Sequence, residues 1–480
     1  MSRVEGRGGH RGTATVVRTE ASGDPAYAPA GRFDVVVAGG GTAGSVAAIA
    51  AARNGARTLL VEEQGFLGGT ATGALVTPLM PNRLGQTNLN RGITDEIKAR
   101  LATMGGGGAT PENDGWFDPE ALKAVLEEMA LEAGVQLLYY TRVIEALVET
   151  ADGGPRQVTG VLVHNKSGLQ RIRARVVVDA TGDADVAASA GCEMRSGGEQ
   201  GERQAFSVRW IAGGVDVPKL ARFVESLGGQ PWPAPYFEAA MVWGRGHVLE
   251  DVFRRAVEAG DLLEADGEYF QCFSVPGRAD ALAFNCPRIA RRVDGTSAED
   301  LTWAQIEGRR AIRRLVAFVR KYLPGCEGAY VQQVAPMVGV RESRRIVGDY
   351  VLTLDDIVTG RKFQDAVARN RYPVDIHLVR DGGRGGGGLV LGSGRPPEGD
   401  FHEIPYRCLL PRGVEGLLVA GRSVSATFEA QSAIRIQPNC HSLGQAAGTA
   451  AALAAARGVT PRGLDAALLR QILREQGAYV

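Results

Sequence analysis

The chain has 480 residues, which is more than one hydrophobic core usually serves, so we expect two domains. Its hydrophobic content of 44% and charged content of 22% are typical of a globular enzyme. Lys plus Arg and Asp plus Glu both number 54, and this balance argues against nucleic acid or an anionic membrane as the main partner.

The N-terminal segment and the cysteines indicate a cytoplasmic protein. Residues 1–31 are rich in Gly, Arg, Thr and Ala without an apolar segment, so we expect a disordered tail and no secretory signal. The six cysteines are scattered and none forms a C-x-x-C pair, which argues against an iron–sulfur cluster or a zinc ribbon and fits a reducing compartment. We expect no metal site, and no membrane span because no stretch approaches the roughly 18 apolar residues required.

Residues 33–63 have the pattern of one nucleotide-binding unit. The apolar, β-branched run 33–40 predicts a buried parallel strand, 45–55 predicts a helix of small residues, and 58–63 predicts a second strand. The strand and the helix are joined by a G-x-G-x-x-G motif. A glycine-rich turn in an unrelated α/β fold is the alternative.

Each part of this unit has a physical role in dinucleotide binding. Gly39 makes the tight turn, Gly41 lets the backbone approach a pyrophosphate, and Gly44 lets helix and strand pack closely. The free amides of the helix N-terminus stabilise phosphate charge. Glu62, at the end of the second strand, is placed to accept the ribose hydroxyls.

The following segments alternate between strands and helices. A helix is expected over 118–135, and strands are expected over 136–149, 157–165 and 169–181. The composition then changes over 196–400, where aromatic residues and helical charge patterns predict a substrate domain.

Near its end, the glycine-rich stretch 381–400 is expected to be a mobile loop, acting either as a gating lid or as a disordered surface insertion. The segments after residue 400 again have the strand and helix patterns of a nucleotide-binding domain. An apolar strand is predicted over 416–427 and a helix over 439–458, in which Gly444 and Gly448, four residues apart, would allow close packing.

These segments resemble the bacterial FAD-dependent oxidoreductase family, which has a glutathione-reductase-like fold. The resemblance covers nearly everything after residue 32. Its most specific parts are 339–377 and 404–413, since the nucleotide motifs are shared by many flavoproteins. The matching segments are DVVVAGGGTAG (34–44), LLVEEQGFLGG (59–69), VDATGDADVAASAG (178–191), GVRESRRIVGDYVLTLDDI (339–357), YPVDIH (372–377), IPYRCLLPRG (404–413) and 416–454.

The resemblance implies an α/β fold with a Rossmann-like FAD-binding domain built from discontinuous segments. That domain would comprise 32–195 and 401–480, with 196–400 inserted as an α+β substrate domain. FAD is the implied cofactor. The implied FAD contacts are Gly39, Gly41, Thr42, Ala43, Gly44, Glu62, Gly68, Gly69, Thr70, Val143, Thr181, Gly182, Asp183, Gly421, Arg422 and Gly444.

Three of these contacts have specific implied roles. Val143 would present its backbone to the adenine, and the chain at Gly421 would pass the diphosphate and the ribityl chain. Many flavoproteins have Asp where this chain has Arg422, which could instead pair with a phosphate. The difference weakens an assignment to aromatic hydroxylases, which rely on that Asp.

Candidate catalytic residues lie in the more specific segments. Arg341 belongs to an arginine-rich run that could bind a substrate carboxylate, clamp a neighbouring acid, or form a salt-bridge network between domains. Asp375 and His377 alternate, so on a strand both would face one side, where the imidazole could act as a general base. A buried, hydrogen-bonded histidine is the alternative. Tyr406 could donate to a substrate oxygen or only pack. His441 could contact the isoalloxazine or substrate, or cap its helix.

The function expected from these residues is hydride transfer between a small hydroxylated or amino substrate and flavin N5. Oxygen, a quinone or a redox partner could accept the electrons. The alternatives are a flavin monooxygenase or reductase that uses NAD(P)H, and a flavin-carrying electron-transfer subunit. The balanced charge disfavours an RNA-modifying role. The sequence leaves the substrate and the oligomeric state open, a homo-oligomer included.

Overall fold

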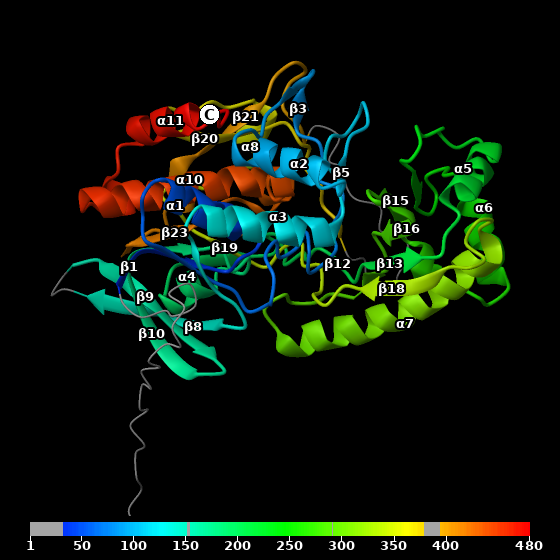
Figure 1. Ribbon diagram of the computed structural model, residues 1–480, viewed down its shortest axis with the longest axis horizontal. Helices are drawn as coiled ribbons and strands as arrows, with labels where there is room; N and C mark the ends of the chain where they lie inside the picture. Colours follow the sequence, from blue (N-terminus) through cyan, green and yellow to red (C-terminus); the bar gives the residue numbers. More distant parts are fainter. Residues whose placement is uncertain (1–31, 151–153, 290, 379–393) are drawn as a thin grey trace, which may run out of the picture.

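The computed structural model describes residues 32–150, 154–289, 291–378 and 394–480 (Figure 1). The predicted tail 1–31 and most of the predicted loop 381–400 lie outside these ranges.

A parallel sheet forms the centre of the larger body. Strand β1 (Arg32–Ala38) lies between β2 (Thr58–Val61) and β10 (Gly168–Asp179), parallel to both. Strand β7 (Gln136–Leu138) extends the sheet beyond β2, and β23 (Leu417–Val419) extends it beyond β10, both also in parallel. The expected mixed α/β fold with a parallel sheet is therefore present.

The same sheet continues as an antiparallel ribbon. The N-terminal half of β10 pairs with β9 (Arg156–Asn165), which pairs with β8 (Arg142–Thr150) and, at its start, with β22 (Val414–Glu415). Polar residues alternate with buried ones along β10 until it enters the parallel part, where it is continuously buried. The short helix α4 (Asp185–Ser189) packs on β8.

Two helices of small residues pack closely on this sheet (Figure 1). Helix α1 (Thr42–Arg53) contacts α10 (Gln437–Arg457) along most of its length. A Cβ added at Gly444 or Gly448 would lie 2.2 or 2.0 Å from carbonyl oxygens of α1, so only glycine permits this approach. The predicted close packing at these two positions is confirmed.

Further helices surround this pair. Helix α3 (Pro119–Glu132) packs beside α1, while α2 (Ile93–Thr103) and α11 (Ala466–Glu475) pack on α10. Asp118 caps α3 by accepting a hydrogen bond from its first turn, at the predicted helix start.

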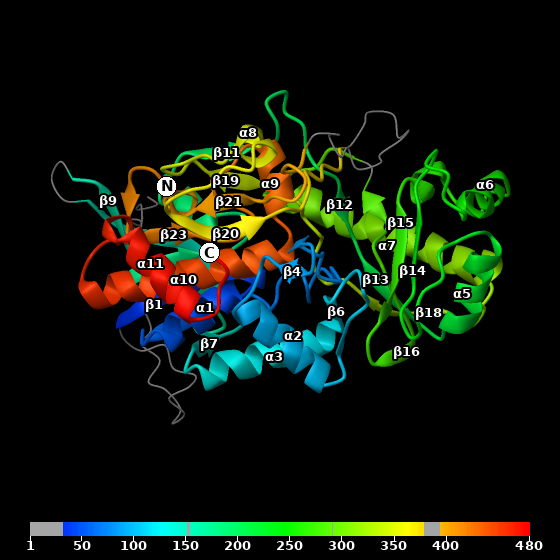
Figure 2. The same ribbon diagram turned by 90° about the horizontal axis from the view of Figure 1, so that it is seen from above.

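A second, antiparallel sheet forms the smaller body, which lies beside the first in Figure 2. Its strand order is β14 (Glu238–Met241), β15 (Phe270–Val275), β16 (Arg278–Phe284), β13 (Trp210–Gly213) and β18 (Tyr330–Val334). Trp210 stacks on Phe284 with ring centroids 4.2 Å apart, inside a core rich in aromatic side chains.

Helices cover this sheet, and short strand pairs complete the fold. The covering helices are α5 (Val217–Ser226), α6 (Glu250–Glu258) and α7 (Ala298–Tyr322). The two-stranded pairs are β3 (Arg83–Leu84) with β4 (Thr87–Asn88), β5 (Gly107–Gly108) with β6 (Trp116–Phe117), β11 (Met194–Ser196) with β19 (Arg344–Ile346), and β12 (Phe206–Ser207) with β17 (Arg288–Ile289).

The segment after β19 packs back onto the larger body. Helix α8 (Leu354–Val358), the pair of β20 (Ala366–Asn370) with β21 (His402–Pro405), and α9 (Phe428–Ile434) all contribute to the core that contains α1 and α10. The predicted substrate range 196–400 therefore includes elements of both cores.

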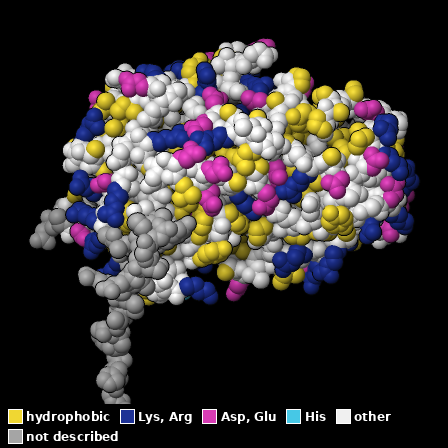
Figure 3. Space-filling view, in the orientation of Figure 1, with side chains coloured by type: hydrophobic (Ala, Val, Ile, Leu, Met, Phe, Trp, Pro, Cys, Tyr) yellow, Lys and Arg dark blue, Asp and Glu magenta, His cyan; other side chains and the backbone are white. Residues whose placement is uncertain are grey.

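Lys and Arg lie interspersed with Asp and Glu over the face shown in Figure 3. None of the helices in the described part of the chain is both long enough and apolar enough to cross a bilayer.

Candidate active site

A cavity of about 920 Å³ opens where the parallel strands of the first sheet end. Residues that directly follow β1, β2, β10 and β23 line one part of it, and residues of the second sheet and α7 line another. Ligands of open α/β sheets bind at this carboxyl edge.

The glycines of the motif have different surroundings. Gly39 has a φ of +92°, and a Cβ there would lie 2.7 Å from a backbone oxygen, so the turn requires glycine. A Cβ at Gly44 would lie 1.8 Å from the carbonyl oxygen of Gly39. At Gly41, by contrast, the nearest atom is 3.8 Å away and the residue lines the cavity. Gly39 and Gly44 thus serve the fold, and Gly41 leaves space for a ligand.

The N-terminus of α1 fits a diphosphate. Gly41 is its N-cap and no side chain caps the helix, so the amides of the first turn are left for another acceptor. Thr42 and Ala43 line the cavity there, near Gly69 and Thr70 of the loop that follows β2. This arrangement is suited to phosphate oxygens.

Glu62 lies farther along the same wall. Its two carboxylate oxygens accept hydrogen bonds from the amides of Gly40 (2.6 Å) and Gln64 (2.7 Å). Burial raises the pKa of Glu62 to about 7. Each oxygen keeps a second lone pair for a ribose hydroxyl. Val143 lines the cavity beside it, as expected for the adenosine end.

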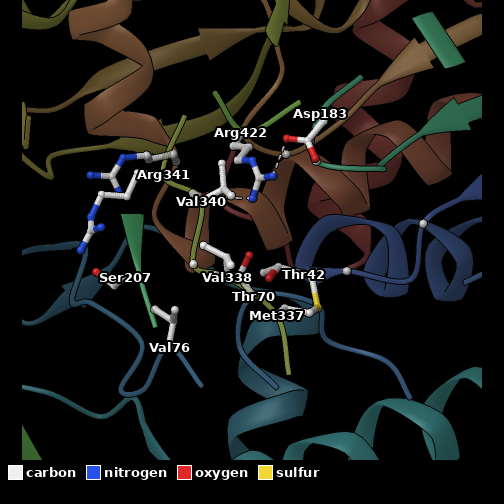
Figure 4. A pocket seen from close by; sticks show the side chains of 18 of the residues that line it. Thr42, Thr70, Val76, Asp183, Ser207, Met337, Val338, Val340, Arg341 and Arg422 are labelled. Carbon is white, nitrogen blue, oxygen red and sulfur yellow. Dashed lines mark hydrogen bonds and ion pairs between the residues drawn. The ribbon is translucent and has the colours of Figure 1, made fainter. Parts of the chain in front are cut away.

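Arg422 and Asp183 form the opposite wall (Figure 4). The guanidinium pairs with the Asp183 carboxylate at 2.7 Å and donates to the carbonyl of Val340 at 3.1 Å. Thr181, Gly182 and Gly421 line the cavity on both sides of this pair. Arg422 therefore already has an acidic partner, which the sequence did not indicate.

Three expected cofactor contacts lie outside the lining: Gly444, Gly68 and Gly44. Gly444 touches α1 rather than the cavity, so its role is helix packing. Gly68 has a φ of +103°, and its carbonyl accepts a hydrogen bond from the Thr42 hydroxyl at 3.3 Å, so it shapes the loop. Gly44 supports the turn, and the other expected contacts line the cavity.

The far end of the cavity is rich in polar side chains from distant parts of the chain. Arg209 precedes β13, Arg341 precedes β19, and Arg435 ends α9. Asp375 and His377 enter from the segment after β20, and the two side chains lie 3.0 Å apart, as their alternation suggested. Figure 4 shows Arg341 at this end of the cavity, on the side away from Arg422.

The hydrogen bonds of His377 define its protonation. Arg288 Nη2 lies 2.6 Å from Nδ1, and because a guanidinium can only donate, Nδ1 must accept. The proton is then on Nε2, which donates to Asp375. Burial and the charge of Arg341 lower the pKa of His377 to about 3. The imidazole therefore has no free lone pair here, and this geometry matches the alternative of a buried, hydrogen-bonded histidine.

Asp375 is the anion of this cluster. Burial alone would raise its pKa, but the hydrogen bond from His377 and the charges of Arg435 and Arg341 hold the pKa of Asp375 well below its usual value. Arg435 Nη2 lies 3.4 Å from the carboxylate.

The arginine-rich run separates in the structure. Arg345 pairs with Glu342 at 3.1 Å in the protein interior, and Arg344 pairs with Asp185. Only Arg341 reaches the far end of the cavity, where it donates to the carbonyl of Ala205. Salt bridges therefore account for Glu342, Arg344 and Arg345. Arg341 is the residue of this run that we keep as a candidate substrate contact.

Two other catalytic candidates do not line the cavity. The Tyr406 side chain is buried and its hydroxyl donates to the carbonyl of Pro461 at 2.9 Å. His441 is buried on α10 and turned away, while Gln437 and Cys440 of the same helix line the cavity. Burial lowers the pKa of His441 to about 3. The structure gives neither residue access to a ligand in this cavity.

Arg209, Arg435 and Asn285 also line the cavity, although none of them was expected there from the sequence. A signal existed for the two arginines. Arg209 follows an apolar stretch and precedes a tryptophan, and Arg435 lies between two isoleucines. A charged residue in an otherwise apolar segment often marks a buried site.

The family model described as FAD dependent oxidoreductase matches residues 34–473. The chain belongs to this family. As an FAD-dependent oxidoreductase it is an enzyme and uses FAD, and the uncapped helix, the open Gly41 and the polar walls of the cavity fit that cofactor.

Two curated relatives are thiamine thiazole synthases. That of Aeropyrum pernix is 33% identical over 167 residues, covering 32% of this chain and 55% of the relative, so the match spans about half of that protein. That of Sulfolobus acidocaldarius is 29% identical over 245 residues, covering 46% of this chain and 86% of the relative. A solved geranylgeranyl bacteriochlorophyll reductase-like protein from Thermoplasma acidophilum aligns with a TM-score of 0.44 at 13% identity, covering 93% of this chain and 84% of that one.

Proposed function

We propose that this enzyme transfers a hydride between a small hydroxylated or amino substrate and N5 of FAD. The observation that carries the proposal is the continuity of one cavity, from the nucleotide loop at Gly41 to the polar cluster around Asp375. When bound, FAD supplies the hydride acceptor. The protein supplies binding, orientation and a place for the substrate proton.

The two ends of the cavity divide these tasks. The turn at Gly41, the first turn of α1 and Glu62 would hold the ADP half of the cofactor. The first turn of α10, where Gln437 and Cys440 line the cavity, would face the flavin. The amides of a helix N-terminus stabilise negative charge that develops near them. The substrate would then lie between this point and the charged cluster.

Asp375 is the group that we assign to the substrate proton. An alcohol or amine must lose a proton as its carbon loses a hydride. Asp375 is the carboxylate at the far end of the cavity, and His377 and Arg435 hold it in place. His377 orients this carboxylate, since Arg288 occupies its remaining lone pair. His377 could take the proton itself only after Arg288 moves.

The test is the reduction of enzyme-bound FAD by candidate substrates without oxygen. Hydroxy acids, amines, polyols and sugars are each added to the purified holoprotein, and the flavin absorbance is followed. The proposal expects one class to bleach the flavin. Bleaching by NAD(P)H alone would contradict it.

Two variants then test the role of Asp375. Asp375→Asn should slow flavin reduction by the active substrate about 10²- to 10⁴-fold, the usual contribution of a general base, while FAD content stays unchanged. His377→Gln should slow it less, because the carboxylate remains. Undiminished reduction in Asp375→Asn would remove Asp375 as the proton acceptor.

A further inference from the structure

The far end of the cavity contains two guanidinium groups without an acidic partner. Arg209 is 9% exposed and donates to the carbonyl of Thr77 at 3.2 Å, and Arg341 donates to the carbonyl of Ala205. Among the described residues, no carboxylate lies within ion-pair distance of either one.

Two other arginines in the described part of the chain do have such partners. Arg345 is 2% exposed and pairs with Glu342, and Arg422 pairs with Asp183. A guanidinium removed from water is costly unless an anion compensates it. Arg209 and Arg341 therefore differ from Arg345 and Arg422, and both line the cavity.

The neighbouring groups leave the cluster with excess positive charge. Arg288, Arg435 and Arg209 all lie near enough to Arg341 to act on its charge. Asp375 already interacts with Arg435 and His377. Glu268 lies near enough to Arg288 to interact with it. Neither acid forms an ion pair with Arg209 or Arg341, so both arginines remain for a ligand to neutralise.

Asn285 adds an acceptor to this cationic end. Its amide nitrogen donates to Gln271 Oε1 at 3.0 Å and to the Tyr269 hydroxyl at 3.2 Å. Gln271 is itself oriented by donating to Glu238 at 2.8 Å, so the network fixes which atom of Asn285 is the oxygen. This oxygen is buried and has no partner among the described residues. It is available to a hydroxyl or amine.

We propose that the substrate is a small carboxylate, bound through its carboxylate group by Arg209 and Arg341, with a hydroxyl or amino group that donates to Asn285. This assignment rests on the proposed function, because it requires the flavin to occupy the other part of the cavity. A carboxylate matches the planar donor fork of arginine better than other oxyanions do. A hydroxy acid or amino acid combines both features.

Bound carboxylate would also change the proton chemistry beside it. Arg341 lowers the pKa of His377 and of Asp375 through its charge. An anion paired with Arg341 would offset this effect, so Asp375, the assigned proton acceptor, would become a better acceptor when the substrate is present.

Equilibrium binding to the FAD-loaded enzyme tests this inference separately from turnover. Acetate, oxalate and succinate are titrated into the holoprotein, and the perturbation of the flavin absorbance gives their Kd. We expect saturable binding that weakens about 10- to 100-fold in Arg209→Gln and in Arg341→Gln. Arg309→Gln is the matched control, since Arg309 is exposed on α7 where it lines the same cavity, and its Kd should stay within about twofold.

Several results would overturn the inference. These are the absence of any carboxylate binding, an unchanged Kd in both variants, and tighter binding of inorganic phosphate than of every carboxylate. Loss of FAD from both variants would show that these arginines hold the cofactor instead. If glycerol or an amine bleaches the flavin while carboxylates do not bind, hydride transfer stands and the carboxylate assignment fails.

Discussion

At the scale of single residues, the nucleotide loop separates two uses of glycine. Gly44 has no room for a Cβ because the carbonyl of Gly39 would lie 1.8 Å away, whereas Gly41 has ordinary space on its cavity side. A side chain at Gly44 would therefore disturb the fold, and a side chain at Gly41 would occupy the volume that a pyrophosphate needs.

This difference predicts that substitutions at Gly41 and at Gly44 have different effects. Gly41→Val should yield a folded protein that retains no FAD, measured as the flavin-to-protein absorbance ratio together with the thermal midpoint of the flavin-free form. Gly44→Ala should instead lower that thermal midpoint. A fully yellow Gly41→Val protein would contradict the placement of the diphosphate.

A buried histidine gives a prediction for acid stability. Burial lowers the pKa of His441 from 6.5 to about 3 in the folded protein, and its Nδ1 has no hydrogen-bond partner among the described residues. Below pH 6.5 the unfolded chain gains a proton at this residue that the folded protein does not bind. Stability from this group is thus intact above pH 6.5 and is lost as the pH falls toward 3.

Replacing His441 should remove this linkage. Between pH 7.5 and 5.5, His441→Leu should gain about 1.4 kcal/mol in unfolding free energy relative to the wild type, whatever the pH-independent cost of the substitution. Urea unfolding at the two pH values measures it. His164 is exposed, so His164→Leu serves as the control. If both variants changed the pH dependence of the unfolding free energy equally, burial of His441 would not be its cause.

At the scale of elements, the contact between α1 and α10 positions both ends of the cofactor site. The N-terminus of α1 and the first turn of α10 both line the cavity, at the places proposed for the diphosphate and the flavin. Glycines hold the two helix axes close together, so a change in this contact would move both walls of the cavity.

Gly448→Ala tests this coupling. The added Cβ would meet a carbonyl oxygen of α1 at 2.0 Å, so we expect a loss of about 1–3 kcal/mol in stability from overpacking and weaker FAD retention. Thermal unfolding and the flavin content measure the two effects. Ala456→Val, at an exposed position near the end of α10, should change neither, and an unaffected Gly448→Ala protein would contradict the packing.

At the scale of the whole molecule, the strands and the helix of the nucleotide-binding part could be predicted from the sequence because the patterns that indicate them are local. A buried strand, a glycine motif and a helix of small residues lie within 30 positions, and β1, α1 and β2 form close to the predicted ranges. The pairing of Asp375 with His377 was likewise readable from their alternation.

The far end of the cavity could be predicted only in part, because it is assembled from residues that are far apart in the chain. Arg209, Arg341 and Arg435 meet only when the second sheet, the segment before β19 and the end of α9 converge. Arg288 determines the protonation of His377 from 89 positions away. Tyr406 and His441 were misplaced for the opposite reason, since proximity in sequence to a nucleotide-binding segment does not decide which way a side chain faces.

The most direct test of the account is the structure of the enzyme with FAD bound. We predict that the ADP half lies along Gly41 and Glu62, and that the isoalloxazine lies between the first turn of α10 and the cluster of Arg209, Arg341 and Asp375, with space left for a small substrate. An isoalloxazine located away from this cluster, or one that fills the arginine-rich end itself, would contradict the proposed active site.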